Sequence, residues 1–364
     1  YEECQPDTDF LYAINRAPPV GGKELYMDAS QGRREFLKKT TFVAGLASAA
    51  SLAGCTAEAP VSPVAKGEKR YKAAFSNVGL QATWCAHGMD TAKQWGEWLG
   101  VDVKIYDSQF SIEKQRRDVE DMATQDWDFV AIQAYGIKTL EEPVKRLIDK
   151  GVPVIDMDTR IVPEGDDIGL WTFVTPDHVK VAEQATEAIA EKMGYRGKLV
   201  HTQGALAHSG AQLRAQGCRN VLKKYPDIEV IDEQPGDWDI SMVGRIWDDL
   251  LVKHKQIDGA FLHNDDMAMA AVQAVKRSGQ KRNIVFGSID AQDVGINGVI
   301  SDDLIVSVMN PSGRIHGTSV MIGYFACALG QKQSEVPPEI IIDGPVVTRE
   351  NAASFQYLME NLLI

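Results

Sequence analysis

Cysteine is scarce in this sequence, and so are the residue patterns that bind metals. Five cysteines occur in 364 residues, and the three that follow Cys55 lie far apart, which leaves no disulfide framework. No CxxC or HExxH pairing is present, and the histidines are scattered along the chain. We therefore predict neither a metal site nor a cofactor.

Basic residues are also in short supply. The chain carries 38 lysines and arginines against 51 acidic residues, which gives a formal net charge of −13. Contact with phosphates needs a basic face, so we expect no nucleic acid among the partners. The excess of acidic residues indicates solubility and says little about chemistry.

Long apolar runs are missing as well. The stretch between Lys39 and Cys55 carries no charge, but it is shorter than the ~20 apolar residues that cross a membrane. It is rich in Ala, Gly, Ser and Thr and follows two arginines and two lysines, which is the layout of an export signal. A small buried helix is the alternative interpretation.

Two short motifs in this region resemble known targeting signals. Residues 33–38 (RREFLK) resemble the twin-arginine export motif, and residues 52–55 (LAGC) resemble a lipoprotein cleavage box. The resemblance implies that residues 33–55 are a signal, that Cys55 becomes the acylated first residue, and that the product is a membrane-anchored lipoprotein of the periplasm or cell envelope. Residues 1–32 precede this signal and are treated as an N-terminal extension outside the fold.

The remaining chain alternates between two kinds of segment. Residues 56–70 lack aromatics and contain Pro60 and Pro63, so we predict a tether. Apolar strand-like segments then occur at Ala73–Phe75, Val101–Tyr106, Phe129–Ile132, Val152–Ile155, Thr172–Val174, Lys198–His201, Ile228–Ile231, Gly259–Leu262, Ile284–Ile289 and Leu304–Val308. Amphipathic helical segments lie at His87–Leu99, Ile112–Gln125, Thr139–Lys150, Val179–Met193, Gln212–Lys224, Ile240–Lys255, Asp266–Ser278 and Arg314–Leu329. Such alternation predicts α/β architecture with parallel sheets covered by helices on both faces, and the length requires two sheets.

The loops that follow the predicted strands have an unusual composition. In parallel sheets ligands bind where strands end and loops leave for the next helix. These loops are rich in amide, carboxylate and guanidinium groups and hold two tryptophans, Trp84 and Trp238. Carboxylates and amides bond adjacent hydroxyls, and an indole face covers the C–H side of a sugar. The set therefore favours a polyhydroxylated ligand.

From about Lys72 to about Ala353 the chain resembles the ribose-type periplasmic substrate-binding proteins, the sugar-capturing subunits of ABC importers. The stretches that carry the resemblance are Leu80–Trp84, Ile132–Gln133, Val152–Thr159, Gln203–Arg214, Gln234–Asp239, His263–Ala268, Gly287–Asp290 and Met309–Pro311. The most specific is His263–Ala268 (HNDDMA), which is close to the family's HNDEMA. The resemblance implies a two-lobed periplasmic-binding-protein type I fold, in which each lobe is a parallel sheet with helices on both faces and a three-segment hinge joins the lobes.

The resemblance also implies boundaries and partners. The expected lobes are residues 71–176 plus 311–346, the N-terminal lobe, and residues 177–310 plus 347–364, the C-terminal lobe. The expected crossings lie near Asp177, near Asn310 and near Pro345–Thr348. The implied partners are a small sugar (pentose or hexose) or polyol and the permease subunits of an ABC transporter, and the protein is expected to be a monomer held at the membrane through its lipid anchor only.

Eight residues are implied to contact the ligand. They are Trp84, Gln133, Asp158, Arg214, Trp238, Asn264, Asp290 and Asn310. In the family pattern the two aromatic residues form opposing walls, the two aspartates accept hydrogen bonds from hydroxyls, the arginine points at the ligand and the amides complete the set. For Asp265, capping of the following helix is as good an interpretation as ligand contact.

The match to the family pattern is incomplete. Ala82 stands where the family often has asparagine, and Thr159 replaces the usual arginine, although Arg160 follows directly and is near enough to reach in. These departures argue against ribose itself as the ligand. Polar neighbours flank Trp238 on both sides, so we expect its indole to be exposed on a loop.

Other functions remain open on the sequence. A set of four residues, Asp158, Asp290, His208 and Ser209, suggests hydrolysis, because glycoside cleavage uses two carboxylates. Nothing in the spacing singles out an acid–base pair, however, and no GxSxG elbow is present. A sugar-responsive repressor needs a basic helix-turn-helix where this chain has an export signal and a tether. A binder that feeds a chemoreceptor or a sensor kinase would use the same pocket. We expect a binding protein without catalytic residues.

Overall fold

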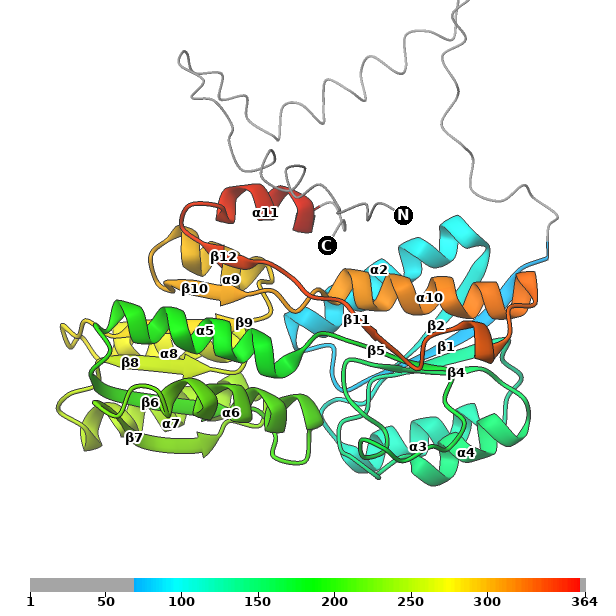
Figure 1. The fold of residues 1–364 in the computed structure, drawn as a ribbon, viewed down its shortest axis with the longest axis horizontal. Coiled ribbons are helices and arrows are strands. Elements are labelled where there is room, and N and C mark those ends of the chain that lie inside the picture. The colour runs from blue at the N-terminus through cyan, green and yellow to red at the C-terminus, as the bar shows by residue number, and fades with distance from the viewer. Residues whose placement is uncertain (1–68, 361–364) are drawn as a thin grey trace, which may run out of the picture. The chain divides into compact units, whose positions relative to one another are not determined.

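The strands in the described part of the chain form two separate six-stranded sheets, and each sheet is the centre of one lobe (Figure 1). The computed structural model describes residues 69–360, which all lie in one compact unit of the chain, Val61–Ile364. The expected signal at residues 33–55, with Cys55, and residues 56–68 of the expected tether lie outside the described residues.

The first sheet, which we call the N-lobe sheet, has the strand order β11-β5-β4-β3-β1-β2, and all neighbouring pairs are parallel. Its strands are β1 (Tyr71–Asn77), β2 (Val101–Asp107), β3 (Phe129–Ile132), β4 (Val154–Met157), β5 (Thr172–Thr175) and β11 (Glu339–Ile341). Its helices are α2 (Thr83–Leu99), α3 (Ile112–Met122), α4 (Glu141–Asp149) and α10 (Ser312–Leu329), with a short 3-10 helix at Gln333–Glu335. Successive side chains of a strand face opposite sides, so Phe75 packs toward α2 and α10 whereas Ala74 packs toward α3 and α4.

The second sheet, the C-lobe sheet, has the order β12-β10-β9-β8-β6-β7, in which only β10 and β12 pair antiparallel. Its strands are β6 (Gly197–Gln203), β7 (Ile228–Pro235), β8 (Gly259–Leu262), β9 (Val285–Ile289), β10 (Val306–Val308) and β12 (Val346–Thr348). Its helices are α5 (His178–Lys192), α6 (Ser209–Leu222), α7 (Ile240–Lys253), α8 (Asp265–Arg277), α9 (Asp293–Ile300) and α11 (Ala352–Glu360). Leu199 packs with α5 and α6, and its neighbour Val200 packs with α7 and α8 on the other face.

The predicted fold class is confirmed, and every predicted strand and helix overlaps an observed one. Five elements were missed: α9, α11, β11, β12 and the short 3-10 helix at Gln333–Glu335. The two strands have three residues each and lie at sheet edges, so they carry no periodic pattern. Helix α9 contains Gly295 and Gly298, which lower helix propensity. Helix α2 begins at Thr83 and not at His87, which places Trp84 in its first turn.

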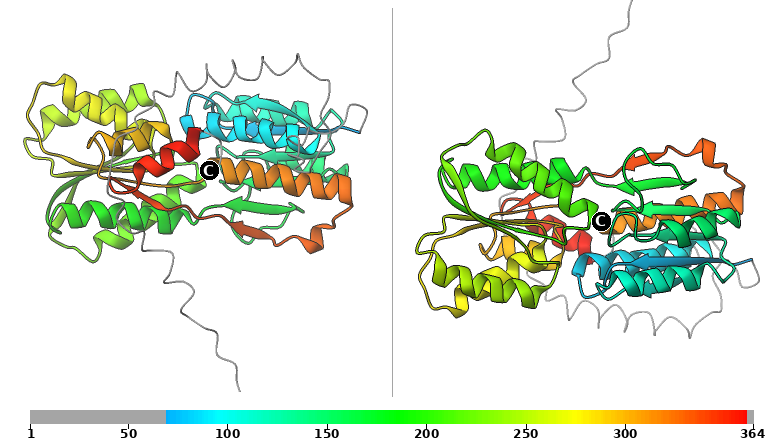
Figure 2. Two further views of the ribbon diagram at one scale, coloured as in Figure 1. Left: turned by 90° about the horizontal axis from the view of Figure 1, so that it is seen from above. Right: turned by 90° about the horizontal axis from the view of Figure 1, so that it is seen from below.

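Three segments connect the lobes (Figure 2). Residues 176–177 join β5 to α5, residues 309–311 join β10 to α10, and residues 342–345 join β11 to β12. The third crossing was expected near Pro345–Thr348, and the observed segment begins and ends three residues earlier than that range. Residues 346–348 already pair with β10, so Val346 belongs to the C-lobe sheet. Among the described residues, no helix combines the length and the apolar character needed to cross a bilayer.

Two helix glycines differ in the space around them. At Gly323 of α10 an added Cβ would lie 2.1 Å from the Phe129 ring, so this glycine lets the helix approach β3. At Gly244 of α7 the nearest atom to an added Cβ is Arg277 Nη2, at 3.7 Å, which is an ordinary contact.

We expect Gly323→Ala to lower the free energy of unfolding by about 1–3 kcal/mol, because the methyl group overpacks the contact with Phe129. Gly244→Ala should raise it by about 0.5–1 kcal/mol, because alanine loses less conformational freedom in a helix. Urea denaturation of both variants measures the difference. Effects of the same sign and size would contradict this view of α10 packing.

Candidate functional site

A cavity of about 40 Å³ lies where the two lobes meet, at the carboxyl ends of their strands. Its walls come from both lobes and from the crossing after β10. The lining residues are Val78, Ala82, Trp84, Cys85, Phe110, Gln133, Asp158, His208, Arg214, Trp238, Asn264, Asp290 and Asn310. All eight residues that the sequence marked as ligand contacts are among them. The structure therefore brings these residues together in one place.

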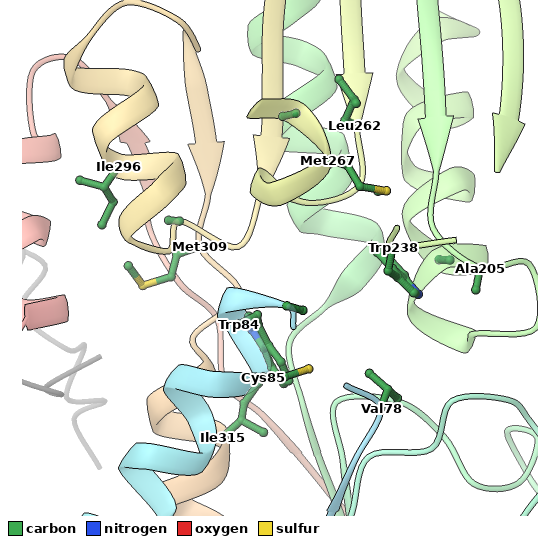
Figure 3. Close-up of a cluster of buried hydrophobic side chains, with 14 of the residues drawn as sticks. Val78, Trp84, Cys85, Ala205, Trp238, Leu262, Met267, Ile296, Met309 and Ile315 are labelled. Atoms are coloured by element: carbon green, nitrogen blue, oxygen red, sulfur yellow. The ribbon is translucent and has the colours of Figure 1, made fainter. Parts of the chain in front are cut away.

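Trp84 forms part of the N-lobe wall. It lies in the first turn of α2, its Nε1–H donates to the Asn310 carbonyl at 2.9 Å, and its ring lies 5.1 Å from that of His316. Figure 3 shows Trp84 and Val78 on one side of the space and Trp238 with Ala205 on the other. Trp84 is almost fully buried, and its hydrogen bond to the Asn310 carbonyl in the second crossing fixes its orientation.

Trp238 forms the facing wall in the C-lobe. Asp237 and Trp238 both have left-handed backbones, with φ of 50° and 64°, and this turn directs the indole over Gly204. A Cβ at Gly204 would lie 2.0 Å from the ring, so only glycine fits there. The expectation of an exposed indole was wrong: Trp238 is 8% exposed, because His208 packs against it edge-on at 5.1 Å and the lobes close over it.

Asp158 is the main polar residue on the N-lobe side of the cavity. It follows β4 with a left-handed backbone, and its two carboxylate oxygens accept from Gln133 Nε2 and Asn310 Nδ2, both at 2.9 Å. Burial alone would raise the pKa of this carboxyl, but the Arg214 guanidinium and the hydrogen bond from Asn310 outweigh that effect, so the pKa lies below its ordinary value. Asp158 is therefore ionised at neutral pH.

The residues after Asp158 do not enter the cavity. Thr159 is buried and donates through its hydroxyl to the Ala134 carbonyl at 2.6 Å. Arg160 turns away and pairs with Glu339 at 2.9 Å while it covers the Phe173 ring. The arginine that the family pattern places at this point thus has no counterpart in the described site.

Arg214 and Asp290 form a buried ion pair on the C-lobe side. Arg214 Nη2 donates to Asp290 Oδ1 at 3.0 Å, and Nη1 donates to the carbonyl of His263. Burial raises the pKa of the Asp290 carboxyl, and the guanidinium opposes this rise. The pair places one positive and one negative group at the cavity wall.

Asn264 and Asp265 take different roles. Asn264 Oδ1 accepts from the Met267 backbone N–H at 3.0 Å, so Asn264 caps α8 and lines the cavity as well. Asp265 does not line the cavity. Its carboxylate accepts from the hydroxyls of Ser288 and Ser307 and from the Gln292 N–H, which ties the ends of β9 and β10 to α8.

Cys85, Phe110 and His208 line the cavity but were not predicted as ligand contacts. Cys85 follows Trp84 in the first turn of α2. Phe110 follows β2, and its position after the carboxyl end of that strand is the sequence signal that could have identified it. His208 precedes α6, and burial lowers its pKa to about 3, so its imidazole is neutral.

Three polar atoms at the cavity wall are buried without a hydrogen-bond partner among the described residues. They are Trp238 Nε1, His208 Nδ1 and Asn310 Oδ1. An unpaired buried polar group costs about 1–3 kcal/mol, so a folded protein rarely keeps several in one place. A ligand with both hydrogen-bond donors and acceptors would satisfy all three.

Contacts between the lobes surround the cavity. Thr83 donates through its N–H and hydroxyl to Asp266 Oδ2 at 2.9 and 3.0 Å, and the Arg160 N–H donates to Ser209 Oγ at 2.9 Å. The space inside holds only a few waters, since one water needs about 10–15 Å³. The described conformation is therefore a closed one, and a larger molecule enters only after the lobes part. Within residues 69–360, no cluster of His, Cys, Asp and Glu has the arrangement to hold a metal ion.

Comparison with known proteins identifies the family. A model of the periplasmic binding protein domain matches residues 73–332 of this chain. The chain belongs to the periplasmic binding proteins. The ribose import binding protein RbsB of Bacillus subtilis is 32% identical over 181 residues, which cover 50% of this chain and 57% of that protein.

Two further relatives align over more of their length. The galactofuranose-binding protein YtfQ of Escherichia coli is 30% identical over 222 residues, 59% of this chain and 70% of that protein. The xylitol-binding protein of Mycolicibacterium smegmatis is 27% identical over 272 residues, 72% of each chain. The alignments thus span between 57% and 72% of these relatives, which are binding proteins and not enzymes.

Solved structures share the fold of this periplasmic binding protein. A galactofuranose binding protein superposes with a TM-score of 0.75 at 23% identity, covering 81% of this chain and all of that one. A twin-arginine translocation pathway signal protein from Burkholderia phytofirmans superposes with a TM-score of 0.76 at 19% identity, covering 81% and 94% of the two chains. At these identities the likeness concerns the fold alone.

His316 supports Trp84 from the side away from the cavity. Its Nδ1–H donates to the Ser312 carbonyl at 2.8 Å, and its Nε2 is buried without a partner among the described residues. Burial lowers the pKa of His316 to about 4, and the hydrogen bond to the Ser312 carbonyl and the charge of Asp158 only partly oppose this effect.

We expect the difference in free energy of unfolding between wild type and His316→Leu to shrink as the pH falls from 6.5 toward 4. The unfolded chain binds a proton at His316 near pH 6.5 while the folded chain does not, so acid destabilises the wild type through this residue in addition to the effects that both proteins share. Over two pH units the change should reach about 2–3 kcal/mol. Urea unfolding at pH 7.5 and pH 4.5 measures it, and a gap that is independent of pH would contradict the assignment.

Proposed function

We propose that this protein is the solute-binding subunit of an ABC importer and that it captures a small sugar or polyol between its lobes. The observation that carries the proposal is the set of unpartnered polar atoms on Trp238, His208 and Asn310 around one interlobe cavity. Buried groups of this kind need a polar ligand, and the relatives named for ribose, galactofuranose and xylitol bind molecules rich in hydroxyls.

The chemistry of the walls supports a sugar. The indoles of Trp84 and Trp238 offer flat apolar faces for ring C–H groups, while Asp158 and Asp290 accept hydrogen bonds from hydroxyls. Ala82 also lines the cavity and offers no hydrogen bond, so one hydroxyl contact of the ribose pattern is missing. A pentose, a hexose or a linear polyol fits this set, and ribose itself is not favoured.

The mechanism is closure without chemistry. Asp158 and Gln133 belong to the N-lobe and Arg214 and Asp290 to the C-lobe, so one ligand that touches both sets stabilises the closed form over the open form. The three hinge segments allow this motion. A permease that recognises the joined surfaces of the two lobes would then receive the sugar unaltered.

Export and anchoring complete the proposal. We infer that residues 33–55 are a twin-arginine lipoprotein signal and that acylated Cys55 holds the protein at the membrane of the cell envelope. Mass analysis of the mature amino terminus tests this part separately. A chain that retains Arg33 and Arg34 without a lipid would contradict it.

Asp290→Asn should abolish most of the ligand-induced rise in melting temperature. A ligand at 100 times its Kd stabilises the folded state by about 2.7 kcal/mol, and loss of a charged acceptor lowers affinity enough to remove that gain. The measurement is a thermal-shift screen with D-ribose, D-allose, xylitol and myo-inositol as probes.

Asp293→Asn is the matched control, because Asp293 is exposed on α9 three residues along the chain and does not line the cavity. It should behave as wild type. A full shift in Asp290→Asn would remove Asp290 from the site, and turnover of any probe sugar by the purified protein would contradict the binding function.

A further inference from the structure

His178 lies outside the cavity lining but touches residues of the site from both lobes. It is the first residue of α5, directly after the crossing at residues 176–177. Its Nδ1 lies 3.3 Å from Arg214 Nε, and its Nε2 lies 2.8 Å from the Asp158 carbonyl oxygen. The side chain is 2% exposed. One imidazole thus connects the main polar group of the C-lobe wall with that of the N-lobe wall.

The two partners determine where the imidazole carries its proton. Arg214 Nε always carries a hydrogen, so Nδ1 of His178 must accept. The Asp158 carbonyl can only accept, so Nε2 must donate. Only the neutral Nε2–H tautomer satisfies both contacts. A protonated ring would present a hydrogen to the guanidinium and would place two positive charges side by side.

We propose that His178 is a positioning residue that sets the affinity for sugar by aligning Arg214 and Asp158 across the hinge in the closed form. The inference rests on the proposed function, because the aligned groups are ligand contacts only if the cavity binds a sugar. His178 itself does not line the cavity. It acts through its two partners, one on each side of the site.

The surroundings of His178 fit this role. Gly210 leaves room for the ring, since an added Cβ there would lie 3.1 Å from the imidazole. The charged and titratable groups around the ring are Asp158, Asp177, His208, Arg214 and His263. Burial lowers the pKa of His178 and Asp158 opposes this, with the balance below the ordinary value, so the ring is neutral at pH 7.

The two contacts are not equivalent. The Asp158 carbonyl also lies 3.1 Å from Thr175 Oγ1, whose hydrogen is shared with the Pro176 carbonyl at 3.0 Å, so it keeps part of a hydrogen bond when His178 is changed. Arg214 Nε has His178 as its acceptor, and a buried donor on a charged group is costly when it is left unpaired. Loss of the Nδ1 contact should therefore matter more than loss of the Nε2 contact.

Two substitutions separate the contacts. In His178→Asn the amide oxygen takes the place of Nδ1 and keeps the acceptor for Arg214, but the donor to Asp158 is lost. In His178→Gln the amide nitrogen takes the place of Nε2 and keeps that donor, but Arg214 Nε loses its acceptor. We expect His178→Gln to weaken binding about 10- to 100-fold and His178→Asn less than about 10-fold.

Calorimetry measures these affinities with the probe among D-ribose, D-allose, xylitol and myo-inositol that binds wild type best. A melting curve of each variant without sugar verifies that the variant folds. If only one variant folds, its affinity alone still shows whether binding is weakened. The ratio of wild-type to His178→Asn affinity should fall as the pH drops below 6.5, because only the wild type has a ring that protonates at this position. Equal affinities for wild type and both variants, with the same pH profile, would overturn the inference.

A measurement without sugar keeps this test separate from the proposed function. Nitrogen-15 spectra of the histidine rings in sugar-free wild type should show a population of the Nε2–H tautomer for His178 from the closed form, and the Nδ1–H tautomer alone would overturn the inference. If no probe binds the wild type while the Nε2–H tautomer is present, the proposed function fails and with it the effect on affinity. If a probe binds and the variants match wild type, only the role of His178 fails.

Discussion

The buried guanidinium of Arg214 is the constraint on which the interlobe site depends. Removing this charge from water costs several kcal/mol, which is offset only when every partner is in place. Its partners are the Asp290 carboxylate, the carbonyl of His263 and the imidazole of His178. They lie after β9, after β8 and at the start of α5, so one side chain fixes the relative positions of three C-lobe elements. His178 also contacts the Asp158 carbonyl in the other lobe. The position of the Arg214 guanidinium at the cavity wall therefore depends on the conformation of the hinge.

A row of hydrogen-bonded side chains behind the cavity positions the aromatic wall in a similar way. The Gly204 N–H donates to His263 Nδ1 at 3.0 Å, so the proton of His263 is on Nε2, which lies 2.9 Å from His201 Nε2. Glu233 lies next to His201 Nδ1 at 3.8 Å and pairs with Arg219 at the surface. Burial lowers the pKa of both histidines, so the row is built from neutral rings. It holds the Gly204 loop where Trp238 packs on it, and residues that never touch the cavity thus determine the shape of its wall.

Much of this architecture could be predicted from the sequence, and the reason is geometric. Strand and helix periodicities give the order of the elements, and the carboxyl ends of parallel strands gather their loops at one edge, which is where Asp158, Asn264 and Asp290 lie. The family resemblance then marked these three residues as ligand contacts. The short edge strands β11 and β12 carry no period and were missed. His178 gave no signal, because its partners lie 20 and 36 residues away and only the folded hinge brings them together. The burial of Trp238 was missed for a related reason, since polar neighbours in the chain do not reveal what the other lobe covers.

The central claim is that a hydroxyl-rich ligand holds the two lobes closed around the cavity, and the distance between the lobes tests it most directly. Spin labels on unnatural side chains at Lys145 in α4 and Val252 in α7, both exposed and one on each lobe, report that distance by pulsed electron resonance. A saturating amount of the sugar that binds best should replace a broad distribution of distances with one short distance. A distribution that the sugar leaves unchanged would contradict the account.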